Sequence, residues 1–348
     1  MKGIVRVLPL ALLVIAAGLP AQERTARAEV SIVGADTNLT RLGSELARLS
    51  QLSGGVMGVA AVHLETGRAV YVNRNEPFPM ASSYKVPIAV QLLTRVDRGE
   101  VRLDSMVALQ PGDLHPGSGT LTELFNDPGV VLSLRNLLEL MLLISDNSAT
   151  DLVLRTAGGA AAVTARMEAL GVSGIRVDRP TVGLIADWSG VRDIPADHNV
   201  PPERFRELAR GVSDAARDSA AAAFSTDPRD TATPEGMAQL LERVWHGQAI
   251  SASSAGLLLD IMRRSTTGGA RIQGMLPPRV EVAHKTGTIG TTTNDVGIIT
   301  LPDDAGHVIV VAFIKQSRVP TEARERAIAQ VARAIYDYFA FNPHGTPR

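Results

Sequence analysis

The sequence predicts an α/β fold of the α+β type, with one antiparallel sheet of five strands, flanking helices and an all-helical subdomain inserted between the strands. Strand-like patterns gather near both ends of the chain, whereas residues 82–265 between them have mostly helical patterns. With 45% apolar and 20% charged residues over 348 positions, the composition is that of a globular protein. The junction between the sheet and the helical subdomain is the expected place for a functional cleft.

The N-terminus has the pattern of a secretory signal peptide. Basic residues precede an apolar run over 7–19, and small residues follow it. The run is shorter than the ~20 residues that a helix needs to cross a bilayer. We therefore expect residues 1–28 to be a signal peptide, with cleavage after Ala21 or Ala28, which would leave a secreted or periplasmic chain.

The remaining residues, 29–348, are enough for a single domain. Amphipathic patterns predict helices over 38–52 and 322–341. Strands are expected on both sides of the helical part, at 56–63, 69–72, 280–284, 295–301 and 307–314. The sheet part of the domain would then comprise about residues 36–81 and 266–342.

The helical part, about residues 82–265, contains two patterns that indicate where its helices lie. Residues 137–144 are apolar almost all round, as expected for a helix buried in the interior. Residues 204–223 are rich in Ala and Arg and are expected to form one exposed helix.

Charge and cysteine content exclude several classes of function. The 35 basic and 36 acidic residues give a formal net charge of -1, which does not indicate a nucleic-acid-binding or polybasic membrane-bound protein. Because there is no Cys, disulfides, thiolate nucleophiles and Cys-ligated zinc are excluded. The His residues outside the motifs below have no metal-ligand spacing. We expect no metal, no cofactor and no nucleic-acid or membrane partner, and a monomer that acts on a small molecule.

Lysine is rare in this chain. Of the 35 basic residues only four are Lys, and outside the predicted signal peptide these are Lys85, Lys285 and Lys315. Arg stays protonated in proteins, whereas a desolvated Lys amine can lose its proton. Each internal Lys is therefore a candidate for chemistry that needs a neutral or compact amine. Chance retention in an Arg-biased proteome is an equal alternative for any one of them.

The first candidate motif is SSYK at residues 82–85. If a helix begins near Ser82, then Ser82 and Lys85 lie one turn apart on the same face, with the hydroxyl at the positive end of the helix dipole. A serine becomes a nucleophile when a base removes its proton, and Lys85 can be that base if burial and a nearby cation lower its pKa. Taken alone, this spacing is more often structural, because many helices contain it.

The second motif, Ser145-Asp146-Asn147, directly follows the predicted buried helix. A turn at this point could aim a hydroxyl and an amide into the cleft. These residue types are also ordinary helix N-caps, and for the motif alone that is the better interpretation.

The third motif is HKTGT at residues 284–288, at the end of a predicted strand. Lys285 would present a fixed positive charge, and Thr286 a hydroxyl, to a substrate carboxylate. Gly287 would let a substrate approach the backbone. The amide of Thr288 could pair with that of Ser82 as an oxyanion hole. The structural alternative is a surface strand end with a glycine bulge.

Together the three motifs occur in the order and on the element types that characterise class A β-lactamases and penicillin-binding proteins. From about residue 38 to residue 340 the chain resembles a class A β-lactamase, in stretches such as FPMASSYKVPIAVQLL, LLISDNSATDLVL, RDTATPEGMAQLL and VAHKTGT. The resemblance implies an exported serine hydrolase that opens the β-lactam amide and thereby confers antibiotic resistance.

The resemblance also implies a role for each motif residue. Ser82 would be the acylated nucleophile and Lys85 its proton acceptor. Ser145 would relay a proton to the leaving nitrogen, and Asn147 would bind the substrate side chain. Arg179 would have a salt-bridged structural role at the start of the omega loop. Four residues would line the strand edge where the carboxylate and the acyl oxygen dock: Lys285, Thr286, Gly287 and Thr288.

The sequence departs from the family pattern in the omega loop. The family has a Glu there that activates the deacylating water, but Thr181 stands at the expected position, and Ile185 stands where an Asn is expected. A Thr hydroxyl has no accessible proton-accepting state near neutral pH. An insertion over about 186–225 follows. Each acid in it that could position the water is more often a solvated surface charge: Asp187, Asp193, Glu203 and Glu207.

Two alternatives therefore stay open beside a β-lactamase with full turnover. The chain could be a D-alanyl peptidase or esterase on the same scaffold, or a penicillin-binding receptor that deacylates slowly. His115 could contact the substrate, although a turn residue is the safer interpretation. Trp188 and Trp245 are expected to be packing residues.

Overall fold

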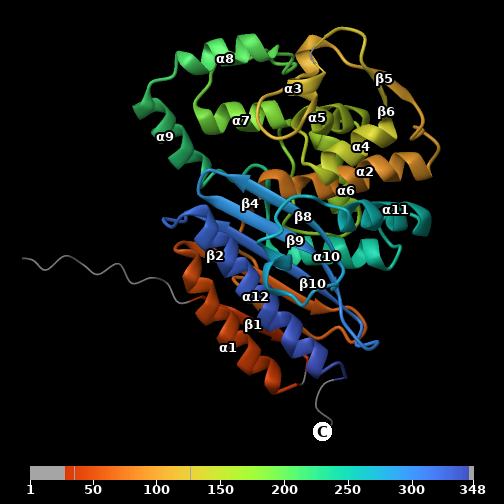
Figure 1. The fold of residues 1–348 in the computed structure, drawn as a ribbon, viewed down its shortest axis with the longest axis vertical. Coiled ribbons are helices and arrows are strands. Elements are labelled where there is room, and N and C mark those ends of the chain that lie inside the picture. The colour runs from red at the N-terminus through yellow and green to blue at the C-terminus, as the bar shows by residue number, and fades with distance from the viewer. Residues whose placement is uncertain (1–27, 35, 126, 345–348) are drawn as a thin grey trace, which may run out of the picture.

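The computed structural model describes residues 28–34, 36–125 and 127–344 (Figure 1). The predicted signal peptide lies outside the described residues, apart from Ala28. Within the described part, no helix is both long enough and apolar enough to cross a membrane.

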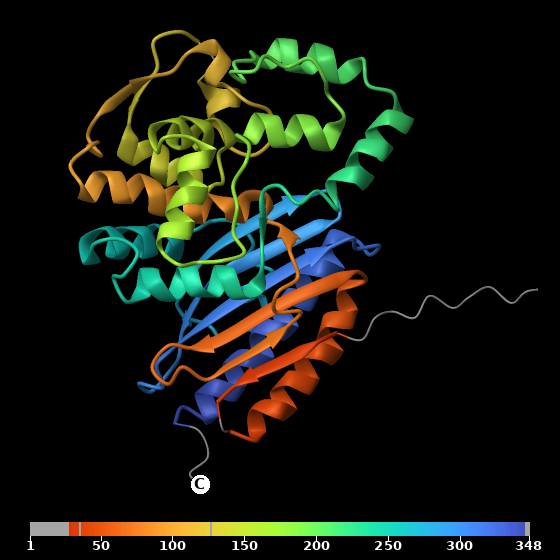
Figure 2. The same ribbon diagram turned by 180° about the vertical axis from the view of Figure 1, so that it is seen from behind.

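Strands from both ends of the chain form one antiparallel sheet, as the sequence predicts (Figure 2). In the described residues this sheet has six strands, in the order β1-β3-β2-β10-β9-β8, rather than the predicted five. The strands are β1 (Val30–Val33), β2 (Val56–His63), β3 (Ala69–Val72), β8 (Val282–Ile289), β9 (Thr292–Thr300) and β10 (His307–Lys315). The missed strand, β1, has four partly exposed residues, too few for a recognisable period, and it forms because β3 pairs with it.

β8 forms the edge of the sheet at which the third motif lies. The prediction ended this strand at residue 284, but it continues to Ile289, because β9 pairs with it from Val282 opposite Ile299 to Ile289 opposite Thr292. Within the described sheet β9 is the one strand that pairs with β8, so β8 is an edge strand.

Helices cover both faces of the sheet and create two cores. α1 (Asn38–Ser50) and α12 (Thr321–Phe341) pack on one face, which places Ile335 and Val310 in the same core. The opposite face packs on the helical part of the chain, where Val311 contacts a second core that includes Leu240. Because neighbouring residues of a strand point to opposite faces, Val310 and Val311 belong to different cores.

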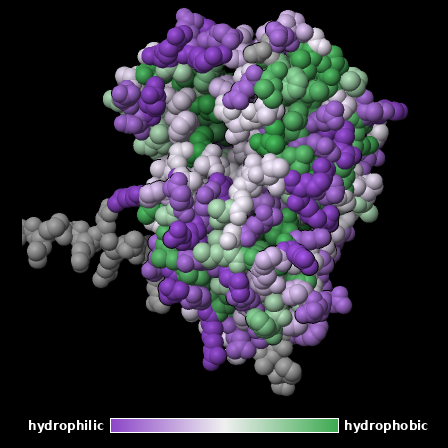
Figure 3. All heavy atoms as spheres, viewed as in Figure 1, coloured by the Kyte–Doolittle hydropathy of each residue, from purple (hydrophilic) through white to green (hydrophobic). Residues whose placement is uncertain are grey.

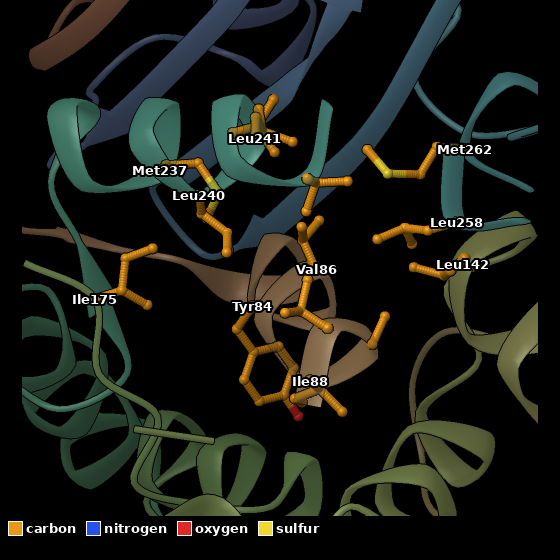
Figure 4. Close-up of a cluster of buried hydrophobic side chains, with 14 of the residues drawn as sticks. Tyr84, Val86, Ile88, Leu142, Ile175, Met237, Leu240, Leu241, Leu258 and Met262 are labelled. Carbon is orange, nitrogen blue, oxygen red and sulfur yellow. The ribbon is translucent and has the colours of Figure 1, made fainter. Parts of the chain in front are cut away.

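The helical part surrounds α2, which is buried along most of its length. In Figure 4 the labelled side chains of α4, α10 and α11 converge on Val86 and Ile88 of α2. The helices of this part are α2 (Lys85–Asp97), α3 (Leu121–Leu124), α4 (Leu134–Leu143), α5 (Asn147–Thr156), α6 (Ala160–Ala169), α7 (Thr181–Ser189), α8 (Pro202–Arg210), α9 (Asp214–Phe224), α10 (Pro234–Trp245) and α11 (Ala252–Arg263).

Two sequence predictions about this part are wrong. It is not all helical, since β5 (Met106–Ala108) pairs with β6 (Val131–Ser133), and β4 (Phe78–Pro79) pairs with β7 (Thr231–Ala232). The single helix predicted over 204–223 is two helices, α8 and α9. The chain breaks there because Gly211 disfavours a helix interior, and the Ser213 hydroxyl caps α9 by accepting the amide of Ala216.

The insertion folds against α7. Val182 and Ala186 of α7 pack with Val191, Val200 and Phe205 in a third, small hydrophobic core. The outer surface over α8 and α9 is mainly hydrophilic in Figure 3.

Candidate active site

Ser82 lies directly before α2, not within it. Residues Ala81–Tyr84 form a 3-10 turn, η2, that leads directly into the helix at Lys85. Ala81 has a φ of 45°, a left-handed conformation that residues other than glycine rarely adopt. Strain of this kind concentrates at functional sites, because the surrounding structure has to hold it. Ser82 is half-buried, whereas Lys85 is completely buried.

The first two motifs meet at the Lys85 amine. Its Nζ lies 2.7 Å from the Ser145 carbonyl oxygen and 3.1 Å from the Ser145 hydroxyl. It also lies 3.1 Å from Oδ1 of Asn147, whose amide nitrogen donates to the Pro116 carbonyl at 3.0 Å. Ser145 has a φ of 62°, so the turn after α4 is the sharp one expected from the sequence.

The third motif joins the same hydroxyl. Nζ of Lys285 lies 3.0 Å from Oγ of Ser145 and 2.9 Å from the Thr286 carbonyl oxygen. Ser145 therefore connects two lysine amines that are 200 residues apart in the sequence. The sequence predicted this meeting from the motifs, and the three motifs do converge.

Burial changes the acid–base state of both lysines. It lowers the pKa of Lys85 from 10.5 to about 7, against the opposing effect of the Asp146 and Asp151 carboxylates. The pKa of Lys285 is also well below its usual range, first because of burial and then because of the neighbouring Lys85 amine. Burial and the neighbouring amine thus both favour the neutral form of Lys285, whereas the sequence led us to expect a fixed positive charge there.

Gly287 allows β8 to lie directly against the turn that carries Ser82. A Cβ atom at this position would lie 2.5 Å from the Met80 carbonyl oxygen and 3.1 Å from the Ser82 amide nitrogen. Both neighbours are backbone atoms, which cannot move aside as a flexible side chain can. The outer edge of β8 and the start of α2 thus form one narrow wall of the site.

Arg271 is a charged residue of the site that the sequence reasoning missed. Its guanidinium is buried and donates to the Gly287 carbonyl at 3.2 Å and to the Thr288 hydroxyl at 2.7 Å. It also pairs with Glu325 of α12 at 3.1 Å. Arg271 lies before β8, in a segment without a recognisable motif. Because the chain is rich in Arg, one more Arg gave no signal in the sequence.

A buried pair supports the back of β8. His284 Nδ1 lies 2.9 Å from Asp295 on β9, and both side chains are completely buried. Asp295 also accepts the backbone amide of Ile272, next to Arg271, at 3.1 Å. This pair therefore links β8, β9 and the segment that holds the guanidinium.

A cavity of about 300 Å³ lies above these groups. Ser82, Asn147 and Thr288 line it, as expected for the predicted site. Lys85, Ser145 and Lys285 lie beneath its floor, where they are buried. Several lining residues were not predicted, among them Tyr84 and also Trp188, which had been expected to be a packing residue.

The start of α7 brings Thr181 to the same cavity. The Thr181 hydroxyl is hydrogen-bonded to the Tyr84 phenol, and burial raises the pKa of that phenol well above its usual value. The Asp151 carboxylate accepts the backbone amides of Thr181 at 2.6 Å and of Val182 at 3.1 Å. Before the helix, Arg179 pairs with Asp230 at 2.6 Å, consistent with the structural role that the resemblance implies.

The other acids considered from the sequence lie away from the cavity. Asp187 pairs with Arg179, and Asp193 is exposed. The remaining two form surface ion pairs on α8, since Glu203 pairs with Arg206 and Glu207 with Arg204. None of these four described carboxylates lines the cavity.

His115 is buried away from the cavity and does not line it. Its Nε2 lies 3.2 Å from the Asp151 carboxylate, the same group that caps α7. In the described residues no group of three or more His, Cys, Asp and Glu side chains could hold a metal ion.

Comparison with known proteins finds relatives along most of the chain. Residues 41–339 match the beta-lactamase enzyme family. The chain is 26% identical to beta-lactamase VEB-1 from Pseudomonas aeruginosa, over 89% of this chain and 94% of that protein. It is 27% identical to beta-lactamase L2 from Stenotrophomonas maltophilia, over 90% and 91% of the two chains.

Solved structures give the same picture. A beta-lactamase from Chitinophaga pinensis has a TM-score of 0.72 and 29% identity, covering 86% of this chain and 99% of that one. An ancestral class A beta-lactamase has a TM-score of 0.69 and 32% identity, covering 85% of this chain and 99% of its own.

Proposed function

Because the chain belongs to the class A branch of the beta-lactamase enzyme family, we propose that it is an exported serine hydrolase that opens the β-lactam amide through an acyl-enzyme on Ser82. One observation carries the proposal: the amines of Lys85 and Lys285 meet at the Ser145 hydroxyl, beneath a cavity that Ser82 lines.

Acylation would begin with proton transfer from Ser82 to Lys85. A pKa of about 7 leaves much of the Lys85 amine neutral at neutral pH, so that it can accept the proton. The Ser82 oxygen then forms a bond to the carbonyl carbon, and the carbon–nitrogen bond of the β-lactam ring breaks. Ser145 passes the proton on to the leaving nitrogen, since its hydroxyl lies 3.1 Å from the Lys85 amine.

The edge of β8 would bind the charged and polar ends of the substrate. The backbone amides of Ser82 and Thr288 are proposed as the oxyanion hole. Lys285 and Thr286 would receive the substrate carboxylate, and an anion placed there favours the protonated form of Lys285. Asn147 would hold the amide of the substrate side chain.

Deacylation is the step for which the site lacks the Glu carboxylate that the family uses to activate water. Thr181 supplies a hydroxyl where the family has a carboxylate, and its partner Tyr84 is a phenol whose raised pKa keeps it neutral. The described residues that line the cavity include no Asp, Glu or His. This favours a second candidate function, a receptor that is acylated quickly and releases the product slowly.

Mass spectrometry after mixing with a penicillin tests the proposal. We expect a covalent adduct on Ser82, and its lifetime separates a hydrolase with turnover from a slowly deacylating receptor. Ser82→Ala should form no adduct. Absence of an adduct in the unmodified protein, together with cleavage of a D-alanyl peptide or a small ester, would instead support a peptidase or esterase.

Export and domain organisation are proposed together with the activity. Residues 1–28 would be removed, and residues 29–348 would act as one monomeric domain. The mass of the protein in a periplasmic fraction should match cleavage after Ala21 or Ala28, and its elution volume should match one chain. A chain that keeps its first 28 residues would contradict the proposed processing.

A further inference from the structure

We infer that α7, held in place by the insertion, makes the cavity selective for β-lactams whose acyl side chain is apolar and uncharged. The inference rests on the proposed function, since it concerns which substrates acylate Ser82 fastest. The face of α7 that carries Leu184, Ile185 and Trp188 sets this preference.

One face of α7 forms a wall of the cavity. Thr181, Leu184, Ile185 and Trp188 all line it, and their spacing of three, four and seven residues puts them on the same side of a helix. After the hydroxyl of Thr181, the wall is therefore apolar for the rest of the helix. The family pattern has a polar Asn where Ile185 stands, so the apolar wall is a property of this chain.

The opposite face of α7 is anchored. Val182 and Ala186 are buried in the small core that the insertion supplies through Val191, Val200 and Phe205. At the start of the helix, Asp151 holds the backbone amides of residues 181 and 182. Because one face and the N-terminus of α7 are held in this way, the helix can present the same surface to every ligand.

Trp188 closes the far end of the cavity. A Cβ atom on Gly290 would lie 2.7 Å from Nε1 of Trp188, so the indole reaches the turn between β8 and β9. Gly290 has a φ of 52° and lines the cavity together with Ile289. An aromatic ring in the ligand would thus find an indole and two aliphatic side chains around it.

The same cavity offers no partner to a charge on the acyl side chain. The described residues that line it carry no charged side chain. The nearest amines, those of Lys85 and Lys285, are buried under the floor and hydrogen-bonded to Ser145. The Arg271 guanidinium is already paired with Thr288 and Glu325. A carboxylate against α7 would lose its hydration without gaining a counter-ion, whereas an aryl group would bury apolar surface.

Two matched penicillins test the inference. One carries a phenylacetyl side chain, and the other carries the same group with an additional α-carboxylate. We expect the second-order rate constant of adduct formation at Ser82 to be at least tenfold larger for the uncharged compound. Equal rates for the two compounds would overturn the inference and leave the proposed function intact, whereas no adduct with either would contradict the proposed function itself.

Substitutions on α7 test whether its apolar face causes the preference for uncharged side chains. Trp188→Ala and Ile185→Ala should each reduce the ratio of the two rate constants at least threefold, and Ile185→Arg should raise the rate for the carboxylated compound. Trp245→Ala is the matched control, because that indole packs on His307, away from the cavity. A ratio unchanged in all three α7 variants, with unaltered melting temperatures, would overturn the assignment to α7.

Discussion

Lys85 is the residue on which the proposed chemistry depends most directly. Its pKa of about 7 reflects burial, which disfavours the ammonium form. We expect the acylation rate constant to rise with pH through about 7 and then to level off, because the neutral amine is the reactive form. Stopped-flow measurement of adduct formation over this range checks the expectation.

Lys85→Arg separates the neutral-amine role from a role of the charge. Arg stays protonated at any relevant pH, so we expect acylation to fall at least 1000-fold even though the positive charge is retained. Ser82→Ala gives the baseline for complete loss. A variant with Arg at this position that keeps a tenth of the activity would contradict the role of Lys85 as proton acceptor.

Thr181 is the residue at which a gain of function is expected. Thr181 lines the cavity, and the resemblance implies that the family has a Glu at this position. Thr181→Glu places a carboxylate there, which can take a proton from a water molecule, and we expect the adduct lifetime to shorten at least tenfold. The decay of the adduct mass after removal of free penicillin measures this lifetime.

Thr181→Gln is the control of similar size without a base. It should leave the adduct lifetime unchanged or lengthen it. Equal shortening by both substitutions would indicate that the Thr181–Tyr84 hydrogen bond, rather than a missing base, limits deacylation.

At the residue scale, the motifs carried most of the information about the site. They predicted that Ser82, Lys85, Ser145 and Lys285 meet. Each motif contains a hydroxyl or an amine, and these are the groups that nucleophilic attack and proton transfer require. They could not indicate Trp188, whose role arises only when a helix places it opposite Gly290. The third internal lysine, Lys315, has a structural role, since it pairs with Glu76 and packs on the ring of Phe78.

The edge of β8 shows how one element depends on the absence of a side chain. A Cβ on Gly287 would lie 2.5 Å from the Met80 carbonyl oxygen, so Gly287→Ala must push the strand away from Ser82. We expect acylation to fall at least 30-fold while the chain stays folded. Adduct formation and thermal unfolding, measured together, check this.

Gly269→Ala is the matched control for that substitution. The position has open space around it, so an added methyl group meets no atom. Both variants lose one glycine, yet we expect only the one on β8 to lose activity. Similar losses in both would show that the effect comes from glycine content rather than from the fit between β8 and η2.

The N-terminus of α7 depends on a carboxylate from another helix. Asp151 of α5 accepts two backbone amides there, in the way that an N-cap residue does. Asp151→Ala should lower the free energy of unfolding by about 1–2 kcal/mol. It should also make the segment around α7 more sensitive to protease, because the free amides no longer have an acceptor.

Denaturant unfolding and limited proteolysis measure these two effects. Asp218→Ala, on the exposed surface of α9, is the control and should change the free energy of unfolding by less than about 0.5 kcal/mol. An Asp151→Ala variant with the same stability and protease sensitivity as this control would show that the two hydrogen bonds do not hold α7.

Elements with a clear period were predicted to within a few residues. β2, β3 and α1 follow their sequence patterns closely. The two strands are apolar runs with both faces in a core, and α1 is amphipathic with one face in a core. The single helix predicted over 204–223 was wrong because an Ala-rich composition hides the break at Gly211. The two short strand pairs of the helical part have two or three residues a strand, too few for any period to show.

At the scale of the whole molecule, the two chain ends build one sheet, as predicted. The structure adds that this sheet has a hydrophobic core on each face. The third core could not be predicted. It depends on contacts between α7 and the insertion, and such contacts leave no local pattern in the sequence. The same core holds the helix that we propose sets substrate preference, so the least predictable part of the fold is also the part that should distinguish this chain from its relatives.

The buried lysines also determine how the stability of the whole molecule depends on pH. In the unfolded chain Lys85 has its ordinary pKa of 10.5, whereas in the folded protein the value is about 7. Between these values the unfolded state binds more protons than the folded state. The free energy of unfolding therefore rises with pH, by up to about 1.4 kcal/mol per pH unit from this group.

Lys85→Met removes this contribution, and Lys285→Met should act in the same direction because burial also lowers the pKa of Lys285. We expect the stability difference between the unmodified protein and Lys85→Met to shift in favour of the unmodified protein as pH rises from 7 to 9. Ser82→Ala keeps both amines and loses activity, so its pH dependence should match the unmodified protein. If urea unfolding gives parallel curves for the unmodified protein and Lys85→Met, then Lys85 keeps its proton in the folded state, and the proposed base for acylation must be sought elsewhere.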